Sequence, residues 1–156
     1  MRRISYVQPD PKSWMEKFHF SIPIKIRYSE TDMTGHLNNV SYFIYFEQGR
    51  VEYLEHLHLM EILFNEETVC VVADQECQYL AQILINEPLR LYIRAAKLGR
   101  SSIDVEYALI EDLTGQLKAV GRGTMVYIDK KSGKSISLPA AARDAIASLE
   151  GESLLA

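Results

Sequence analysis

Cysteine is scarce in this chain, and its scarcity limits the kinds of site that the protein can carry. Only Cys70 and Cys77 occur among 156 residues, with no Cys-x-x-Cys pair. Both fall in one predicted strand, where seven residues at about 3.3 Å each place them roughly 23 Å apart. A disulfide needs Cα atoms about 4.4–6.8 Å apart, so the two cannot pair there. His19, His56 and His58 lack the spacing of metal ligands, so we predict neither a disulfide framework nor a metal site.

Long apolar runs and an excess of positive charge are also missing. The longest uninterrupted apolar runs are five residues, far short of the roughly 20 residues of a membrane span. The N-terminus has a basic pair but no apolar core, so it does not read as a signal peptide. The net charge is −4, so the chain lacks the excess of positive charge that is usual in a nucleic-acid-binding protein. We expect a cytoplasmic protein that acts on small molecules, with neither a nucleic acid nor a membrane as partner.

The composition that remains is that of one soluble globular domain. Apolar residues make up 47% of the chain and charged residues 24%, which is ordinary for a folded protein of this size. Residues 1–20, punctuated by Pro9 and Pro11, are predicted to be a leader segment. Residues 21–150 are predicted to form the single domain.

Alternating apolar residues predict five strands. The first covers residues 22–28, and the rest are joined in part by hairpin turns. The four later segments are 68–80, 89–98, 101–110 and 116–129. Helical spacing appears over residues 39–58, and a proline-capped tail helix is predicted over 138–149. The order predicts an α+β fold in which an antiparallel sheet wraps around one long helix.

The helix predicted over 39–58 carries apolar and aromatic residues on most sides, which is typical of a buried helix. One stripe is expected to face the core, formed by Val40, Phe43, Ile44, Val51, Leu54 and His58. Asn38 or Asn39 would provide the N-cap. Glu47 lies in the same stripe, where an unpaired carboxylate is unfavourable. Arg50, one turn further on, is its predicted partner.

Residues 26–54, "IRYSETDMTGHLNNVSYFIYFEQGRVEYL", resemble the start of the hotdog-fold acyl-CoA thioesterases of the 4-hydroxybenzoyl-CoA thioesterase group. The shared features are an aspartate after a strand, a glycine-containing turn, an asparagine-rich helix start and a Glu-x-x-Arg pair. "KLGRSSIDVEYAL" (97–109) and "GTMVYIDKKSGKSISLP" (123–139) resemble later strands of that group. The resemblance implies a hotdog fold, hydrolysis of acyl-CoA to a free acid and coenzyme A without a cofactor, and a homodimer or homotetramer.

The stretch "DMTGHLNN" (32–39) contains the parts that thioester hydrolysis needs. A helix N-terminus offers unpaired N–H donors and a positive dipole end to a developing oxyanion. Gly35 permits a tight bend that can bring the carboxylate of Asp32 back towards those donors and Asn38. Asp32 is the predicted catalytic carboxylate, as nucleophile or as general base. The N–H of Asn39 matches the family's carbonyl-polarising position. The simpler alternative is that Asp32 only caps a turn.

Two further residues are catalytic candidates with structural alternatives. His36 stands four residues after Asp32 and resembles the histidine of plant-type acyl-carrier-protein thioesterases, although Thr34 replaces an asparagine of that pattern. It either lines the site or lies in the loop without a role. Glu47 is either a structural brace, paired with Arg50 or with the loop, or the catalytic acid, because a related thioesterase clan carries its acid on this helix.

The remaining candidates concern substrate binding. Tyr42 either lines the acyl pocket or belongs to the core. Lys97, Arg100 and Ser101 surround a predicted turn, where their donors could bind the phosphates of coenzyme A. The alternative for these three residues is a solvated turn.

The fold alone leaves other functions open. An acyl-carrier-protein thioesterase would use the same chemistry on another carrier. An (R)-hydroxyacyl dehydratase would need His36 as its catalytic histidine, and the loop resembles the thioesterases instead. A non-catalytic domain that binds acyl-CoA is the third alternative.

Overall fold

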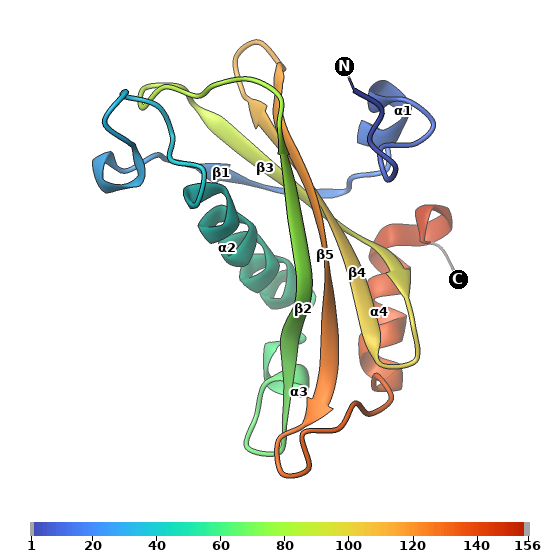
Figure 1. Ribbon diagram of the computed structural model, residues 1–156. Coiled ribbons are helices and arrows are strands. Elements are labelled where there is room, and N and C mark those ends of the chain that lie inside the picture. The colour runs from blue at the N-terminus through green and yellow to red at the C-terminus, as the bar shows by residue number, and fades with distance from the viewer. Residues whose placement is uncertain (1, 155–156) are drawn as a thin grey trace.

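The computed structural model describes residues 2–154, which form a five-stranded antiparallel sheet in the order β1-β3-β4-β5-β2 (Figure 1). The strands are β1 (Phe20–Ile24), β2 (Thr68–Tyr79), β3 (Leu89–Leu98), β4 (Ser102–Glu111) and β5 (Leu117–Asp129). Tight connections join β3 to β4 and β4 to β5 as antiparallel neighbours. The four later strands lie within one residue of the predicted bounds, which confirms the α+β class.

The first strand is shorter than predicted and lies further towards the N-terminus. It pairs only with β3, from Phe20 opposite Ile93 to Ile24 opposite Leu89. This ladder ends where β3 begins, directly after Pro88, which has no N–H to donate. The chain then turns into a 3-10 helix, Tyr28–Glu30. The prediction of a strand through residue 28 was therefore wrong.

The helices are α1 (Pro11–Met15), α2 (Ser41–His56), α3 (Met60–Leu63) and α4 (Ala140–Glu150), followed by a short 3-10 helix, Gly151–Ser153. With 16 residues, α2 is the longest, and it packs against β1 and β3. It begins two residues later than predicted, with Val40 at the N-cap position. Asn38 nevertheless accepts two hydrogen bonds just outside the helix. The N–H of Val40 donates to its side-chain Oδ1 (3.3 Å), and the N–H of Ser41 donates to its backbone carbonyl oxygen (2.9 Å). No described helix has the length and apolar character needed to cross a membrane.

The face of α2 that packs on the sheet differs from the predicted stripe. Val40 and Ile44 are more than half exposed, and Glu47 is exposed as well. Apolar residues occupy both sides of this helix, so their periodicity could not identify the buried side. The inner face is continuous and consists of Tyr42, Tyr45, Phe46, Gly49, Tyr53 and Leu54.

The opposite face of the sheet is covered by the N-terminal segment. Trp14 of α1 is fully buried there and donates from Nε1 to Oε2 of Glu106 at 2.7 Å. The same carboxylate pairs with Arg94 at 2.9 Å. Ile4, Val7 and the ring of Phe18 join this cluster. The segment predicted as a leader is thus packed on the domain.

The strand β2 forms one edge of the sheet. Its 12 residues pair with β5 on one side, and among residues 2–154 no strand pairs with its other side. Val71 and Val72 are 39% and 44% exposed along it. A long, partly apolar edge of this kind is a template for pairing with another chain.

Candidate active site

The loop between the 3-10 helix and α2 is a small hairpin that presents Asp32. The N–H of Asp32 donates to the carbonyl oxygen of His36 at 2.8 Å, and the N–H of Gly35 donates to that of Asp32 at 3.1 Å. Thr31 and Leu37 form a β-bridge at its base. Gly35 has a φ of +79°, a left-handed conformation that favours glycine. The predicted tight bend at Gly35 is therefore present.

The carboxylate of Asp32 is held through one of its two oxygens. Oδ1 accepts from the N–H of Thr34 (2.8 Å), from the hydroxyl of Thr34 (2.5 Å) and from the N–H of His36 (3.4 Å). These donors, the Thr34 hydroxyl above all, lower the pKa of Asp32 below its usual value, because they stabilise the charged form. Oδ2 accepts no hydrogen bond from residues 2–154. The carboxylate is thus ionised, oriented and free at one oxygen.

Thr34 also links Asp32 to His36. Its Oγ1 lies 2.9 Å from Nδ1 of His36. A hydroxyl has one hydrogen, and Thr34 gives it to Asp32, so Oγ1 accepts from a protonated Nδ1. In the neutral imidazole, Nε2 is then the acceptor. In the sequence, Thr34 stands out only as a departure from the plant-type pattern, although a threonine two residues after an aspartate is typical of such turns.

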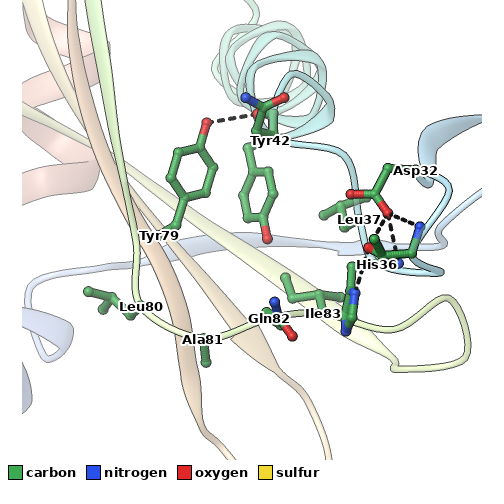
Figure 2. Close-up of a pocket in the computed structure, with 11 residues that line it drawn as sticks. Asp32, His36, Leu37, Tyr42, Tyr79, Leu80, Ala81, Gln82 and Ile83 are labelled. Atoms are coloured by element: carbon green, nitrogen blue, oxygen red, sulfur yellow. Dashed lines mark hydrogen bonds between the residues drawn. The ribbon is translucent and has the colours of Figure 1, made fainter.

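These side chains line a cavity of about 540 Å³ at the N-terminal end of α2 (Figure 2). Three segments form it: the Asp32 hairpin, the start of α2 and the chain just after β2. Its lining residues are Asp32, Thr34, His36, Leu37, Asn39, Tyr42 and residues 79–83. Of the predicted site residues, it brings together Asp32, His36, Asn39 and Tyr42, with Gly35 and Asn38 in the connecting chain.

The start of α2 is fixed to the sheet by two tyrosines. The hydroxyl of Tyr79 donates to the carbonyl oxygen of Asn39 at 2.8 Å, and Tyr42 packs edge-on against the Tyr79 ring at 4.7 Å. The N–H of Asn39 finds no acceptor among residues 2–154 and so stays available to a ligand. Burial raises the pKa of Tyr42 to about 12, so its hydroxyl is neutral at pH 7. Tyr79 was not predicted as a site residue, because it lies 40 residues away in sequence.

Glu47 is not part of this cavity, and the brace that was predicted for it is not formed. Its side chain is exposed and lines a separate cavity. Arg50 donates instead to Oε1 of Gln75 at 2.5 Å and to the hydroxyl of Tyr107 at 3.1 Å. The pairing was wrong because Arg50 points into the sheet while Glu47 lies on the outer side of the helix.

Lys97, Arg100 and Ser101 also lie away from Asp32 within one chain. Lys97 lies near the end of β3, and Arg100 and Ser101 lie in the β3–β4 turn, at the other end of the sheet from the Asp32 hairpin (Figure 1). Arg100 donates to the hydroxyls of Ser135 and Ser137, each at 3.2 Å. One chain therefore does not bring the predicted phosphate-binding residues to the predicted catalytic residue.

Known proteins resemble this chain over most of its length. Protein YsmA of Bacillus subtilis, which is uncharacterized, is 40% identical over 137 residues, 88% of this chain and 91% of that protein. A thioesterase from Thermus thermophilus, crystallised with coenzyme A and zinc, is 32% identical with a TM-score of 0.76, and the match covers 88% of this chain and 99% of that one. The acyl-CoA thioester hydrolase YbgC of Escherichia coli is 26% identical over 85 residues, 54% of this chain and 63% of that protein.

The family itself follows from a match over the whole central region. The model of the Thioesterase-like superfamily matches residues 26–146, from just after β1 into α4. The match includes the Asp32 hairpin, α2 and strands β2 to β5. The chain therefore belongs to the Thioesterase-like superfamily, with hotdog-fold thioesterases among its structural neighbours and thioester hydrolysis as the chemistry that this membership supports.

Proposed function

We propose that this protein hydrolyses acyl-CoA thioesters to a free acid and coenzyme A, with Asp32 as the catalytic carboxylate. The observation that carries the proposal is that Asp32, with an ionised carboxylate, and Asn39, with an unused N–H, both line one cavity at a helix N-terminus. The coenzyme A bound to the Thermus thioesterase and the activity named for YbgC support the choice of carrier. The specific relation to the 4-hydroxybenzoyl-CoA thioesterase group is part of the same proposal.

Each group has a distinct role in this proposal. The N–H of Asn39, at the positive end of α2, stabilises the negative charge that develops on the thioester oxygen. Thr34 lowers the pKa of Asp32 and fixes the orientation of its carboxylate. His36, with Nε2 as acceptor, lines the cavity beside the acid, and Tyr42 forms part of the acyl wall. Gly35 and Asn38 shape the chain around the substrate.

Asp32 has two possible routes to the acid product. As a general base it takes a proton from water, whose oxygen adds to the carbonyl carbon before the C–S bond breaks and the thiolate leaves. As a nucleophile its oxygen forms a mixed anhydride and expels the thiolate, and water then attacks the anhydride. A single turnover in ¹⁸O-water tests for the nucleophilic route. Water attack on the Asp32 carbonyl of the anhydride puts ¹⁸O into the protein, whereas the general-base route puts it only into the released acid.

A homodimer, with a homotetramer as the alternative, is the assembly that the proposal includes. The unpaired edge of β2 would pair with a second copy, so that a continuous curved sheet wraps around the central α2 helices. Lys97, Arg100 and Ser101 could then approach the Asp32 cavity only from another copy, since they lie at the far end of the same chain. Light scattering of the purified protein measures the assembly.

A thiol-release assay over acyl-CoA thioesters of different length tests the function. We expect Asp32→Asn to lower kcat/KM by about 10²–10⁴-fold, the usual contribution of a positioned acid–base group. Asp144→Asn, which changes an aspartate of α4 far from the cavity lining, is the matched control and should leave turnover unchanged. Full activity of Asp32→Asn would refute the role of this carboxylate.

The same assay separates the alternative functions. Faster release from acyl-carrier protein than from coenzyme A would indicate an acyl-carrier-protein thioesterase. Hydration of enoyl-CoA would indicate a dehydratase that uses His36. Tight binding of acyl-CoA without thiol release would indicate a non-catalytic binding domain.

A further inference from the structure

Arg50 is a buried cation without a carboxylate partner. Its side chain lies under the sheet and the residue is 9% exposed. Nη1 donates to the neutral oxygens of Gln75 and Tyr107, while Nε and Nη2 donate to no acceptor among residues 2–154. No carboxylate in that range lies within 4.0 Å of the guanidinium. Among the described residues, Oε2 of Glu150 is the one fully buried side-chain polar atom without a partner, so Nε and Nη2 of Arg50 are in contact with solvent and open to a ligand.

The guanidinium lines a cavity of about 250 Å³ that shares no lining residue with the Asp32 cavity. Its walls come from α2, α3, β2 and β5. They are mostly apolar and consist of Val51, Leu54, Met60, Phe64, Cys70, Val72 and Met125. Burial raises the pKa of the Cys70 thiol to about 11, so this wall is neutral at pH 7. An apolar pocket with a few polar groups at fixed positions is the usual form of a small-molecule site.

Glu47 is the one acid that lines this cavity. It is exposed to solvent and forms no ion pair with Arg50. Its charge opposes the binding of an anion, although solvent weakens this repulsion relative to the attraction of a buried guanidinium. Glu47 therefore provides a test of the charge of the ligand, because neutralising Glu47 should help an anion to bind.

We propose that this cavity binds a carboxylic acid with a short apolar chain, whose carboxylate accepts from the free Nε and Nη2 groups of Arg50. The guanidinium fork matches a carboxylate with two parallel hydrogen bonds, and the apolar walls enclose the chain. At about 30 Å³ for each water-sized group, the cavity holds roughly eight non-hydrogen atoms, the size of hexanoate. The site does not depend on the proposed hydrolysis, since a free acid can bind whether or not this protein releases it.

If the proposed acyl-CoA hydrolysis holds, this site would be a regulatory site. A short acid is then the product class of the Asp32 cavity. Arg50 lies just past the middle of α2, and Asn39 lies two residues before the first residue of this helix. Product bound at Arg50 would act on the helix that also carries the oxyanion donor.

Titration of the ¹⁵N-labelled protein with hexanoate tests the proposal, with the Nε–H signal of Arg50 as the readout. This signal is assigned by its loss in Arg50→Met. We expect it to shift saturably with hexanoate, and 1-hexanol to bind at least tenfold more weakly. Glu47→Gln should tighten hexanoate binding severalfold. An unshifted Nε–H signal, or equal affinity for the alcohol, would overturn the proposal.

Two further variants locate the site. Val72→Phe places a larger ring on the wall of this cavity from a half-exposed position, so it should abolish binding even if Arg50→Met folds poorly. Asp32→Asn should leave hexanoate binding at Arg50 intact, because the two cavities are separate. Binding that survives Val72→Phe and is lost in Asp32→Asn would place the acid in the Asp32 cavity and overturn the proposal. If the oligomer closes the cavity, wild-type protein will show no shift, and the proposal fails in that case too.

Discussion

Thr34 donates twice to the same oxygen of Asp32, from its N–H at 2.8 Å and from its hydroxyl at 2.5 Å. Both bonds stabilise the carboxylate over the neutral acid, and they lower the pKa of Asp32. The side chain lies at the surface, so these donors, and not a buried countercharge, lower its pKa and fix its direction. The loop thus supplies a charged oxygen at the cavity without burying a charge.

Replacing Thr34 by valine should move the acid limb of the pH–rate profile upwards. Loss of the hydroxyl removes a donor that favours the charged form, so Asp32 takes up its proton at a higher pH and activity is lost there. We expect the variant to lose severalfold more activity than wild type at the acid end, with a smaller change near pH 7. Measurement of kcat/KM between pH 3 and 7 checks this shift.

The control is Thr31→Val, because Thr31 lies in the same loop but its hydroxyl donates to Tyr28. If the acid limb of the pH–rate profile were identical in the two variants, the role of Thr34 would be contradicted.

Replacing Tyr79 by phenylalanine should lower kcat and have only a small effect on the free energy of unfolding. The variant keeps the ring contact with Tyr42 but loses the bond to the carbonyl oxygen of Asn39, so the start of α2 is less firmly placed. We expect kcat to fall about tenfold or less, since small misplacements of catalytic groups are costly. The free energy of unfolding should fall by about 1 kcal/mol at most. Tyr92→Phe, on the opposite face of the sheet, should affect neither quantity, and an unchanged kcat in Tyr79→Phe would refute the positioning role.

Gly121→Ala should destabilise the protein, because the ring of Phe46 occupies the space that a side chain would need. A Cβ at residue 121 would lie 2.5 Å from Cε2 of Phe46 and 2.9 Å from the carbonyl oxygen of Glu76. Phe46 cannot move easily, since it stacks on Tyr107 at 4.2 Å. We expect a loss of about 1–3 kcal/mol in denaturant unfolding. The loss should be smaller in a Phe46→Leu background, and wild-type stability of Gly121→Ala would contradict the observed packing.

The stability of Glu150→Gln relative to that of the wild-type protein should increase as the pH rises. Burial raises the pKa of Glu150, while Tyr53 and the N–H of Ala95 donate to its Oε1. A group whose pKa is higher in the folded state stabilises the fold below its unfolded pKa, which is about 4.3 for glutamate, and this contribution is lost as pH rises through the folded value. Glutamine stays neutral and avoids that loss.

The measurement for Glu150 is the difference in Tm between variant and wild type at pH 5 and pH 8. The difference should favour glutamine more at pH 8 by a few degrees, since 1 kcal/mol corresponds to about 2–4 °C for a chain of this size. Glu152→Gln, on the exposed surface of the following turn, controls for the change in net charge. An equal Tm difference at both pH values would show that the pKa of Glu150 does not change on folding.

The sequence alone determined the strands and the turn that carries Asp32. Alternation over β3, with Leu91, Ile93 and Ala95 on one face, fixes side-chain direction locally, and each of the four later strands was located within one residue. Gly35 and the polar residues around it are likewise a local signal, because their conformation depends on neighbours in the chain. The resemblance of the same stretch to thioesterases led to the family.

Tertiary structure alone decided which sides of α2 are used and which distant residues meet. Aromatic and aliphatic residues surround this helix, so only contact with the sheet selects Phe46 over Ile44 as core. The bond from Tyr79 to Asn39 and the separation of Arg50 from Glu47 depend on strand pairing across dozens of residues. Periodicity reports the local direction of a side chain, whereas the partner that it meets is set by where the rest of the chain folds.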